Sequence, residues 1–429
     1  MRLGGRLQAA IEVLQDIENR RRPVAEALKD WGLSHRFAGA GDRAAIGNIV
    51  YDALRRKLSL YWLMDSDDIS ALAYGALMSD GALSWQALEH ALEGDKFRPK
   101  KLNADQRHSW ENRNIHDAAD YIQADVPYWC ISHLQNMFGN NWCNEARSLS
   151  ERPPLDLRVN TLKSSSDKML RALESVHIKP IPWMKDALRI APIEKLGRHP
   201  NVQAEPAFQK GFFEVQDLGS QIVAHLVGAK SGMQVLDYCA GAGGKSLALA
   251  AHMQNRGQIY AYDAEKARLA PIFERLRRAD VRNVQPHAKK GDLAPLKQQM
   301  DIVLVDAPCT GTGTWRRRPD AKWRLSEAQV ERRVKEQEEV LNAAMSYVKL
   351  GGHLVYITCS LFSSENDQQV SSFLKTHHDF HKLDMKTVWD NAFEGNTPTP
   401  LFSQYGLALS PLTTQTDGFF ISILEKNIT

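Results

Sequence analysis

The sequence has few cysteines, no long apolar run and no excess of either charge. Five cysteines among 429 residues are too few, and odd in number, for a disulfide framework, so we expect a reducing compartment. No apolar stretch approaches the length needed to cross a bilayer, and the first residues, MRLGGRLQAA, lack the apolar core of a signal peptide. We therefore expect a cytoplasmic protein with no membrane partner.

The charges are nearly balanced, with 54 lysines and arginines against 51 acidic residues and a net charge of +3. A polyanionic partner would therefore have to be held by local basic patches. The length predicts more than one domain, and the chain is expected to act as a monomer. Cys130 and Cys143 have no C-x-x-C companion or nearby histidine pair, so we expect no metal site and interpret both as small buried hydrophobes.

Residues 1–145 are predicted to be helical, because strand-like alternation is nearly absent there. One apolar helical face is formed by Leu7, Ala10, Ile11 and Leu14. The stretch GDRAAIGNIVYDALRRKLSLYWLM repeats the same spacing, with Asp42 as its predicted N-cap. These patterns indicate a small helical bundle. Arginines flank the predicted helices, and they form either solvated faces or an RNA-facing patch.

The pattern changes in the rest of the chain. Within residues 146–210, PLDLRVNTL alternates like a strand and a short helix and further strands follow, which indicates a small α+β unit. Within residues 211–429, MQVLDYC, GQIYAYD, DIVLVDA and GHLVYIT alternate with helices, which favours an α/β fold with a parallel, doubly wound sheet. Pro271 is predicted to interrupt one helix. Another is predicted to begin with a capping box at Ser326 and to stop at Gly351 and Gly352.

The stretch VLDYCAGAGGKS places a glycine-rich turn between a strand and a helix. Gly241, Gly243 and Gly244 would let the backbone approach a ligand, and the helix N-terminus favours an anionic group. Asp263 ends the next strand, where an acid accepts hydrogen bonds from ribose hydroxyls, and a further acid follows at Asp292. The spacing matches neither a dinucleotide fingerprint nor a phosphate loop, so S-adenosylmethionine fits better than a polyphosphate. The alternative is a tight structural turn.

Two cysteines lie in similar settings, fifty residues apart. Cys309 in DAPCTGTGT and Cys359 in YITCS each follow an apolar, β-branched run and precede small, turn-forming residues. Doubly wound sheets place their sites at the carboxyl ends of strands, so both thiols are candidate site residues. The alternative is that each is a small buried hydrophobe.

These motifs resemble those of the bacterial RNA cytosine-5 methyltransferases of the Sun/Nop2 type. VQDLGSQIV, DYCAGAGGKS, DAPCTGTGTWRRRPDAKW, YITCS and DGFF occur in the family's order across residues 150–429, although Ala242 stands where proline is usual. The helical region, with DRAAIGNIVYDALRR, is similar to the NusB-like RNA-binding domain that precedes this enzyme in many bacteria. The resemblance implies a Rossmann-like class I methyltransferase domain after a small RRM-like unit that binds RNA.

The resemblance also implies the roles of individual residues. A thiolate that adds to carbon 6 of cytosine makes carbon 5 nucleophilic enough to accept a methyl group. Family resemblance assigns the nucleophile to Cys359, assistance in product release to Cys309 and a hydrogen bond to the pyrimidine edge to Asp306. The expected cofactor-binding set is Cys239, Ala240, Gly241, Ala242, Gly243, Gly244, Lys245, Asp263, Arg268, Asp292 and Asp306.

The basic, aromatic stretch WRRRPDAKWR follows Cys309 directly. We expect RNA phosphates to be bound there, while the tryptophans stack on bases or pack in the interior. The expected RNA-binding residues are Arg316, Arg317, Arg318, Lys322 and Arg324. A solvated face is the alternative. The target base must leave its stack, which favours single-stranded or loop RNA.

Three alternatives to this interpretation stay open. The NusB-like region favours small-subunit (16S) ribosomal RNA as the substrate, but transfer RNA is not excluded. A DNA cytosine-5 methyltransferase uses the same covalent chemistry, although that family is expected to use the proline-cysteine thiol and to lack the TCS partner. A non-catalytic RNA-binding or antitermination factor is the alternative of another class, and the glycine-rich loop and both cysteines argue against it.

Overall fold

The computed structural model describes residues 1–79, 83–194 and 196–428. The chain divides into two compact units. The helical unit comprises Met1–Pro153, Pro192–His199 and Thr314–Leu325, and the sheet unit comprises Pro154–Ala191, Pro200–Gly313 and the chain from Ser326 onward. The stretch that follows Cys309 in sequence therefore leaves the sheet unit after Gly313 and folds with the helices.

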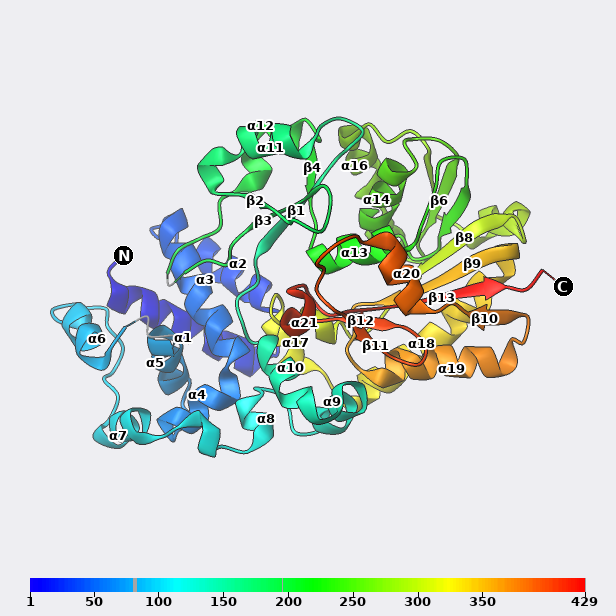
Figure 1. Ribbon diagram of the computed structural model, residues 1–429. Coiled ribbons are helices and arrows are strands. Elements are labelled where there is room, and N and C mark those ends of the chain that lie inside the picture. Colours follow the sequence, from blue (N-terminus) through cyan, green and yellow to red (C-terminus); the bar gives the residue numbers. More distant parts are fainter. Residues whose placement is uncertain (80–82, 195, 429) are drawn as a thin grey trace. The chain divides into compact units, whose positions relative to one another are not determined.

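The helical unit packs amphipathic helices around one apolar core (Figure 1). The face predicted from Leu7, Ala10, Ile11 and Leu14 is buried, with no side chain more than 3% exposed. Its helices are α1 (Leu3–Arg20), α2 (Val24–Ser34), α3 (Ala40–Arg55), α4 (Lys57–Met64), α5 (Ile69–Met78), α6 (Trp85–Leu92), α7 (Ala104–Asn112), α8 (Asp120–Gln123), α9 (Cys130–Phe138), α10 (Trp142–Ser148) and α17 (Pro319–Arg324). The predicted helical bundle is thus confirmed, whereas its likeness to a NusB domain stays a prediction.

The predicted N-cap at Asp42 is wrong by three residues, because the N-cap is Gly39. Helix α3 begins at Ala40 after Gly39, and Asp42 is its third residue. The Asp42 carboxylate accepts a hydrogen bond of 3.3 Å from the Gly39 amide, as in the second half of a capping box. An acid at the N-cap accepts from amides of the first turn, whereas an acid at this position accepts from the N-cap amide. Both are typical of helix starts, so sequence alone does not separate them.

The sheet unit contains a small antiparallel sheet in the order β2-β3-β1-β4. Its elements are β1 (Leu155–Val159), β2 (Lys179–Pro180), β3 (Ala187–Ile190), β4 (Phe213–Val215), α11 (Ser166–Ala172) and α12 (Pro206–Gln209). In β1, Leu157 lies opposite Leu188 on one side and Val215 on the other. The predicted boundary at residue 210 therefore cuts β4 from its own sheet. A three-residue strand is too short to show an alternating pattern.

The larger sheet has nine strands among the described residues, in the order β11-β12-β13-β9-β8-β5-β6-β7 with β10 paired to β13. Its strands are β5 (Gln234–Asp237), β6 (Gln258–Tyr262), β7 (Val284–His287), β8 (Met300–Asp306), β9 (Val348–Thr358), β10 (Phe380–Lys382), β11 (Leu401–Phe402), β12 (Leu407–Leu409) and β13 (Phe419–Lys426). Strands β5 to β9 pair in parallel, which confirms the predicted α/β fold. The order of strands reverses between β5 and β8, where such sheets bind ligands.

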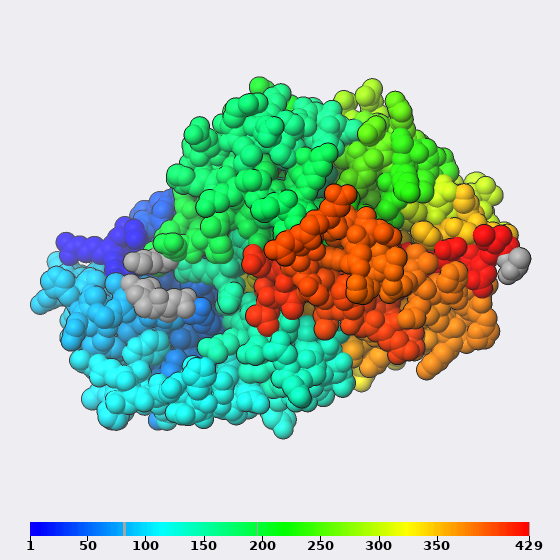
Figure 2. Space-filling model, viewed as in Figure 1, coloured from blue at the N-terminus to red at the C-terminus, as the bar shows by residue number. Residues whose placement is uncertain are grey.

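Helices cover both faces of this sheet (Figure 1). One face carries α13 (Leu218–Leu226), α14 (Gly244–His252) and α16 (Ile272–Ala279), and the other carries α18 (Glu327–Ala344) and α19 (Asp367–Thr376). The remaining helices are α15 (Lys266–Leu269), α20 (Met385–Ala392) and α21 (Pro411–Thr414). The chain from α20 to α21 forms one continuous surface of this unit, coloured orange to red in Figure 2. Among the described residues, no helix combines the length and apolarity needed to span a membrane.

Two helix boundaries test the sequence predictions. Pro271 separates α15 from α16, and the capping box at Ser326 is present, both as predicted. Helix α18 ends at Ala344, however, and not at the glycines, which lie inside β9. A Cβ atom at Gly352 would meet the Met300 carbonyl oxygen at 2.9 Å, so the glycine serves close strand pairing and not helix termination.

A second close approach ties the turn after Cys309 to the start of β13. A Cβ atom at Gly313 would lie 2.2 Å from the Gly418 carbonyl oxygen, and the Gly418 amide donates a 2.8 Å hydrogen bond to the Gly313 carbonyl. The backbone of Gly418 therefore leaves room only for glycine at position 313. By contrast, a Cβ atom at Gly291 would meet nothing within 4 Å.

We predict that Gly313→Ala lowers the melting temperature by about 3–10 °C, because a methyl group there displaces backbone that cannot move cheaply. Thermal unfolding followed by circular dichroism measures the shift. Gly291→Ala is the matched control and should melt close to the unsubstituted protein. Equal melting temperatures for the two variants would contradict the predicted contact.

Candidate active site

The sheet brings together the two cysteines that the sequence places at strand exits. Strands β8 and β9 pair in parallel, with Asp306 opposite Ile357, so the loops that follow them leave from the same edge. The Sγ atoms of Cys309 and Cys359 lie 3.3 Å apart. The amide of Gly313 donates a 2.9 Å hydrogen bond to the Cys359 carbonyl, which joins the two loops. Both thiols are partly exposed.

A buried glutamate holds both cysteine loops. Glu365 has no exposed surface, and its carboxylate accepts hydrogen bonds from the Thr310 amide at 2.8 Å and the Thr310 hydroxyl at 2.5 Å. The hydroxyl of Ser360 and the amide nitrogen of Gln337 also donate to it. Thr310 follows Cys309 and Ser360 follows Cys359, so one carboxylate fixes the residue after each thiol. Several hydrogen bonds to one buried carboxylate are strong, and together they restrict the positions of the carboxylate and of its donors.

Sequence reasoning missed Glu365. It lies in a short 3-10 turn, Ser363–Glu365, six residues beyond Cys359. A glutamate in a polar stretch such as SSEND is most often solvent-exposed, so no local pattern marks it as a buried hub. Only the pairing of β8 with β9 places its carboxylate between the two loops.

Contact between the two thiols affects the pKa of Cys309. The hydrogen bond to Cys359 raises the pKa of the Cys309 thiol well above its ordinary value, and burial and the charge of Glu365 add to the shift. Two adjacent thiols cannot both ionise cheaply. Contact with Cys359 therefore favours the protonated form of Cys309.

The glycine-rich turn lies against the acid predicted to bind a ribose. The Gly241 amide donates a 2.9 Å hydrogen bond to the Asp263 carboxylate, and Gly241 and Gly243 both have positive φ. A Cβ atom at Gly243 would meet Ile272 at 2.4 Å, so this turn accepts only glycine there. A Cβ atom at Gly241 would lie within 4.0 Å of Arg268 and Asp263, which shows that the loop faces this pair.

Lys245 belongs to this loop but pairs with the strand that carries the catalytic candidates. It lies in the first turn of α14, and its Nζ atom donates a 2.6 Å hydrogen bond to the Asp306 carboxylate. Strand β5 lies next to β8, so the helix that follows β5 brings the lysine to the end of β8. The lysine is 7% exposed and its ammonium lies 5.4 Å from the Phe419 ring. This ion pair links the predicted cofactor loop to the two thiols.

Asp237 ends β5 beneath the glycine turn and is 1% exposed. Ser246 donates a 2.6 Å hydrogen bond to one carboxyl oxygen, and the other has no hydrogen-bond partner in the described structure. Burial raises the pKa of Asp237 to about 7, and burial likewise raises the pKa of the neighbouring Cys239 thiol. An unsatisfied buried oxygen at a switch point suits a ligand that brings its own donor.

Other members of the predicted cofactor set are less closely joined. Arg268 is half exposed, with a guanidinium nitrogen 4.0 Å from the Asp263 carboxylate. The Ala242 carbonyl accepts a 2.8 Å hydrogen bond from Arg275, which anchors the turn from outside. Asp292 is exposed on a 3-10 turn, Lys290–Leu296, and its part in cofactor binding stays a prediction.

The basic stretch after Cys309 folds differently from the expectation. Arg316 and Lys322 are 3% and 1% exposed. The Lys322 ammonium donates a 3.0 Å hydrogen bond to the Arg55 carbonyl, and the Arg55 guanidinium donates a 2.8 Å hydrogen bond to the Arg316 carbonyl. Burial lowers the pKa of Lys322 to about 8, against the opposing charge of Asp125. Both cations serve the interior of the helical unit, so the prediction that they bind RNA is wrong.

Arg317, Arg318 and Arg324 differ from these two. Arg318 and Arg324 are exposed and Arg317 is partly exposed. Arg324 also pairs with Asp320 at 2.7 Å. Trp315 is fully buried and Trp323 donates a 2.6 Å hydrogen bond to the Leu54 carbonyl, so both tryptophans pack instead of stacking on bases. In the part of the chain that the structure describes, no three histidine, cysteine or acidic side chains form a metal-binding group.

Two regions of the chain match models of known protein families. Residues 224–425 match the family described as 16S rRNA methyltransferase RsmB/F. Residues 126–193 match the ferredoxin-like domain of RsmF/B-like methyltransferases. The first region contains the glycine-rich turn and both cysteines.

Whole proteins and solved structures extend the comparison. Ribosomal RNA small subunit methyltransferase B of Escherichia coli is 32% identical, and the alignment covers 98% of this chain and 96% of that protein. The protein of the same name from Photorhabdus laumondii is 35% identical over 59% of this chain, and the matched part spans 58% of that protein. The crystal structure of a methyltransferase homologue from Pyrococcus horikoshii is 26% identical, with a TM-score of 0.59 over 72% of this chain and 97% of that chain.

We predict that removing the Cys359 thiol lowers the pKa of Cys309. Contact with Cys359 is the largest cause of the raised value, so Cys359→Ala should increase the thiolate fraction of Cys309 at any given pH. Alkylation of Cys309 by iodoacetamide, followed by peptide mass spectrometry between pH 6 and about pH 10, reports this change.

The midpoint of the alkylation profile should move to lower pH in the Cys359→Ala variant. Cys143, on α10 of the helical unit, provides an internal control, since its surroundings do not include Cys359. An unchanged midpoint for Cys309 would contradict the coupling.

Proposed function

The chain belongs to the 16S rRNA methyltransferase RsmB/F family, and from this premise we propose that it transfers a methyl group from S-adenosylmethionine to carbon 5 of a cytosine in RNA. The observation that carries the proposal is the pair of thiols at the ends of β8 and β9, whose sulfur atoms lie 3.3 Å apart. A methyl transfer to an oxygen or an exocyclic nitrogen needs no thiol nucleophile, whereas an unreactive ring carbon does.

The substrate is proposed to be small-subunit ribosomal RNA, the substrate class in the names of its relatives from Escherichia coli and Photorhabdus laumondii. No feature of the described residues favours transfer RNA instead. Three arginines of the basic stretch remain proposed phosphate contacts: Arg318 and Arg324, which are exposed, and Arg317, which is partly exposed. Arg316 and Lys322 are left out because they are buried.

The cofactor is proposed to bind at the turn after β5. The backbone amides of Ala242 and Gly244 would face its carboxylate, since those of Gly241 and Gly243 already donate to Asp263 and to the Ala240 carbonyl. Asp263, with Arg268 nearby, would hold the ribose. The unpartnered oxygen of Asp237 fits a ligand with an amino group, and the Asp263 carboxylate beside Gly241 fits a ligand with a sugar. When bound, S-adenosylmethionine supplies an electrophilic methyl group.

The chain's own residues would act on the base in order. The Cys359 thiolate forms a bond to carbon 6, and the displaced electron pair makes carbon 5 an enamine carbon that attacks the methyl group. Asp306, held by Lys245, is the proposed hydrogen-bond partner of the pyrimidine edge. Afterwards the proton on carbon 5 must be removed, and the electrons of that C–H bond re-form the double bond as the sulfur leaves.

The coupling between the thiols gives Cys309 a role at this last stage. While Cys359 is free, it raises the pKa of Cys309, which therefore stays protonated and does not compete as a nucleophile. Once the Cys359 sulfur is bonded to carbon 6, it carries no negative charge and is a poor hydrogen-bond acceptor, so both effects of Cys359 on the pKa of Cys309 weaken. Cys309 would then lose its own proton to solvent more readily, and the resulting thiolate would accept the proton from carbon 5.

We predict that Cys359→Ser reduces methylation by about 10³-fold or more, because a serine hydroxyl does not ionise near neutral pH. Incorporation of radiolabelled methyl groups into small-subunit ribosomal RNA measures the loss. Cys143→Ser, a substitution in the helical unit, is the matched control and should retain activity. Full turnover by the Cys359 variant would contradict its assignment as the nucleophile.

We predict that Cys309→Ala still permits attack on the base but stalls its release. Because Cys359 is intact, the protein should accumulate covalently bound to RNA. A slowly migrating band on denaturing gels, sensitive to ribonuclease, measures this adduct. The double variant lacking both thiols should form none. A Cys309→Ala enzyme that turns over normally without an adduct would contradict the role in release.

A further inference from the structure

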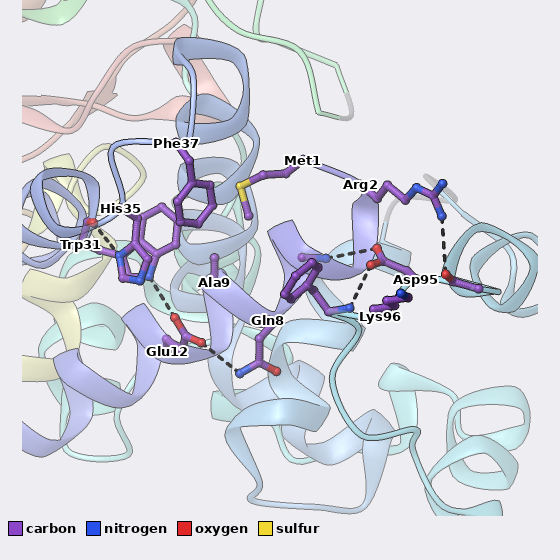
Figure 3. Close-up of a pocket in the computed structure, with 13 residues that line it drawn as sticks. Met1, Arg2, Gln8, Ala9, Glu12, Trp31, His35, Phe37, Asp95 and Lys96 are labelled. Atoms are coloured by element: carbon purple, nitrogen blue, oxygen red, sulfur yellow. Dashed lines mark hydrogen bonds between the residues drawn. The ribbon is translucent and has the colours of Figure 1, made fainter.

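The helical unit contains a pocket that the methylation chemistry does not use. It encloses about 790 Å³ beside the start of α1 and the end of α2. Figure 3 shows Trp31, His35 and Phe37 gathered at one end, and Arg2 and Lys96 at the other. Aromatic rings therefore gather at one end of the pocket, and two cations lie with Asp95 at the other.

Three aromatic rings in mutual contact line one end of the pocket. Trp31 and His35 stack with centroids 4.2 Å apart and an angle of 9° between their planes, and Phe37 meets the His35 ring edge-on at 5.7 Å. Phe37 is 71% exposed, and Phe97, which also lines the pocket, is 76% exposed. Single exposed apolar side chains are common, but two large aromatic rings lining one pocket indicate a binding surface.

The segment that carries Phe97 is held in place against α1. The Asp95 carboxylate accepts hydrogen bonds from the Gly5 amide at 3.3 Å and from the Phe97 amide at 3.0 Å. A Cβ atom at Gly4 would lie 2.6 Å from the same carboxylate, so glycine at the helix start permits this approach. The Phe97 backbone is thus fixed before any ligand arrives, which lowers the entropic cost of binding.

Positive charge surrounds these rings. The exposed cations next to the two phenylalanines in sequence or at the pocket mouth are Arg2, Arg36, Lys96, Arg98, Lys100 and Lys101. The acids of the pocket are already engaged, since Asp95 accepts two backbone amides and Glu12 accepts the Trp31 indole at 3.0 Å and the Gln8 amide at 3.2 Å. Exposed aromatic rings interleaved with cations, as in KFRPKK, are typical of surfaces that bind single-stranded nucleic acid.

We propose that this pocket is an accessory RNA-binding site, in which an unpaired nucleobase stacks against Phe37 and Phe97 while the flanking phosphates contact the surrounding cations. The inference rests on the proposed function for its partner, RNA, but it concerns a site outside the sheet unit that carries out the reaction. The charge of the surface and the flatness of its walls favour a nucleobase over an apolar peptide, which would need neither.

The test uses the full chain and a fluorescently labelled single-stranded RNA of about 12 adenine and uracil nucleotides. Because this RNA contains no cytosine, no covalent chemistry contributes to its binding. Phe37→Leu with Phe97→Leu keeps apolar side chains but removes both π faces, and should weaken binding about ten-fold in fluorescence anisotropy. Phe37→Tyr with Phe97→Tyr keeps the rings and should bind as the unsubstituted protein does.

Two controls separate stacking from general effects. Tyr128→Leu removes a ring that is 73% exposed elsewhere in the helical unit and should leave affinity unchanged. Lys96→Gln with Arg98→Gln should lower the slope of log affinity against log salt by about one for each phosphate that the variant no longer binds. Affinity retained by the leucine pair, or an unaltered salt slope, would overturn the proposal and indicate an apolar protein partner instead.

The same variants separate this proposal from the proposed function. With full-length small-subunit ribosomal RNA, the leucine pair should raise KM about ten-fold and leave kcat unchanged, because the thiols are untouched. A protein that methylates no cytosine but still loses binding in the leucine pair would contradict the proposed function and support the pocket. A protein that methylates normally, with unchanged affinity and KM in the leucine pair, would contradict the pocket alone.

Discussion

The parallel pairing of β8 with β9 is the constraint on which the site depends. It brings the carboxyl ends of two strands to the same edge, so two thiols separated by fifty residues in sequence lie 3.3 Å apart. The buried carboxylate of Glu365 then fixes the residue after each thiol. A fully buried charge with four donors tolerates little movement, so the distance between the sulfur atoms is set by the fold and not by loose side chains.

This closeness also affects the pKa of Cys309. Contact with Cys359 raises the pKa of Cys309, and the effect weakens once the Cys359 sulfur is bonded to carbon. In the proposed reaction, one residue would act first as nucleophile, and the other would ionise more readily when a base is needed to remove the proton from carbon 5. The Lys245–Asp306 ion pair connects this chemistry to the glycine-rich turn, because α14 and β8 meet at the switch point of the sheet.

The sequence predicted the parts of the site that depend on local pattern. The four apolar runs, the glycine turn and the strand exits at Cys309 and Cys359 all follow from alternation and turn chemistry. Features that depend on tertiary contact were missed or misread. Glu365 carries no local signal, Gly352 reads as a helix stop although it serves strand pairing, and Lys322 reads as a surface cation although it is buried beside Asp125. Charged residues in a sequence indicate possible ionic contacts. Only the fold decides whether these contacts are made with RNA or inside the protein.

The central claim is that the Cys359 sulfur, and not that of Cys309, bonds to the cytosine ring. RNA that carries 5-fluorocytidine tests it most directly. Fluorine replaces the hydrogen on carbon 5, so there is no proton to remove and the covalent complex persists. Peptide mass spectrometry of that complex should find the modified nucleotide on the peptide containing YITCS. A modification on the peptide containing DAPCT, with Cys359 free, would contradict the account.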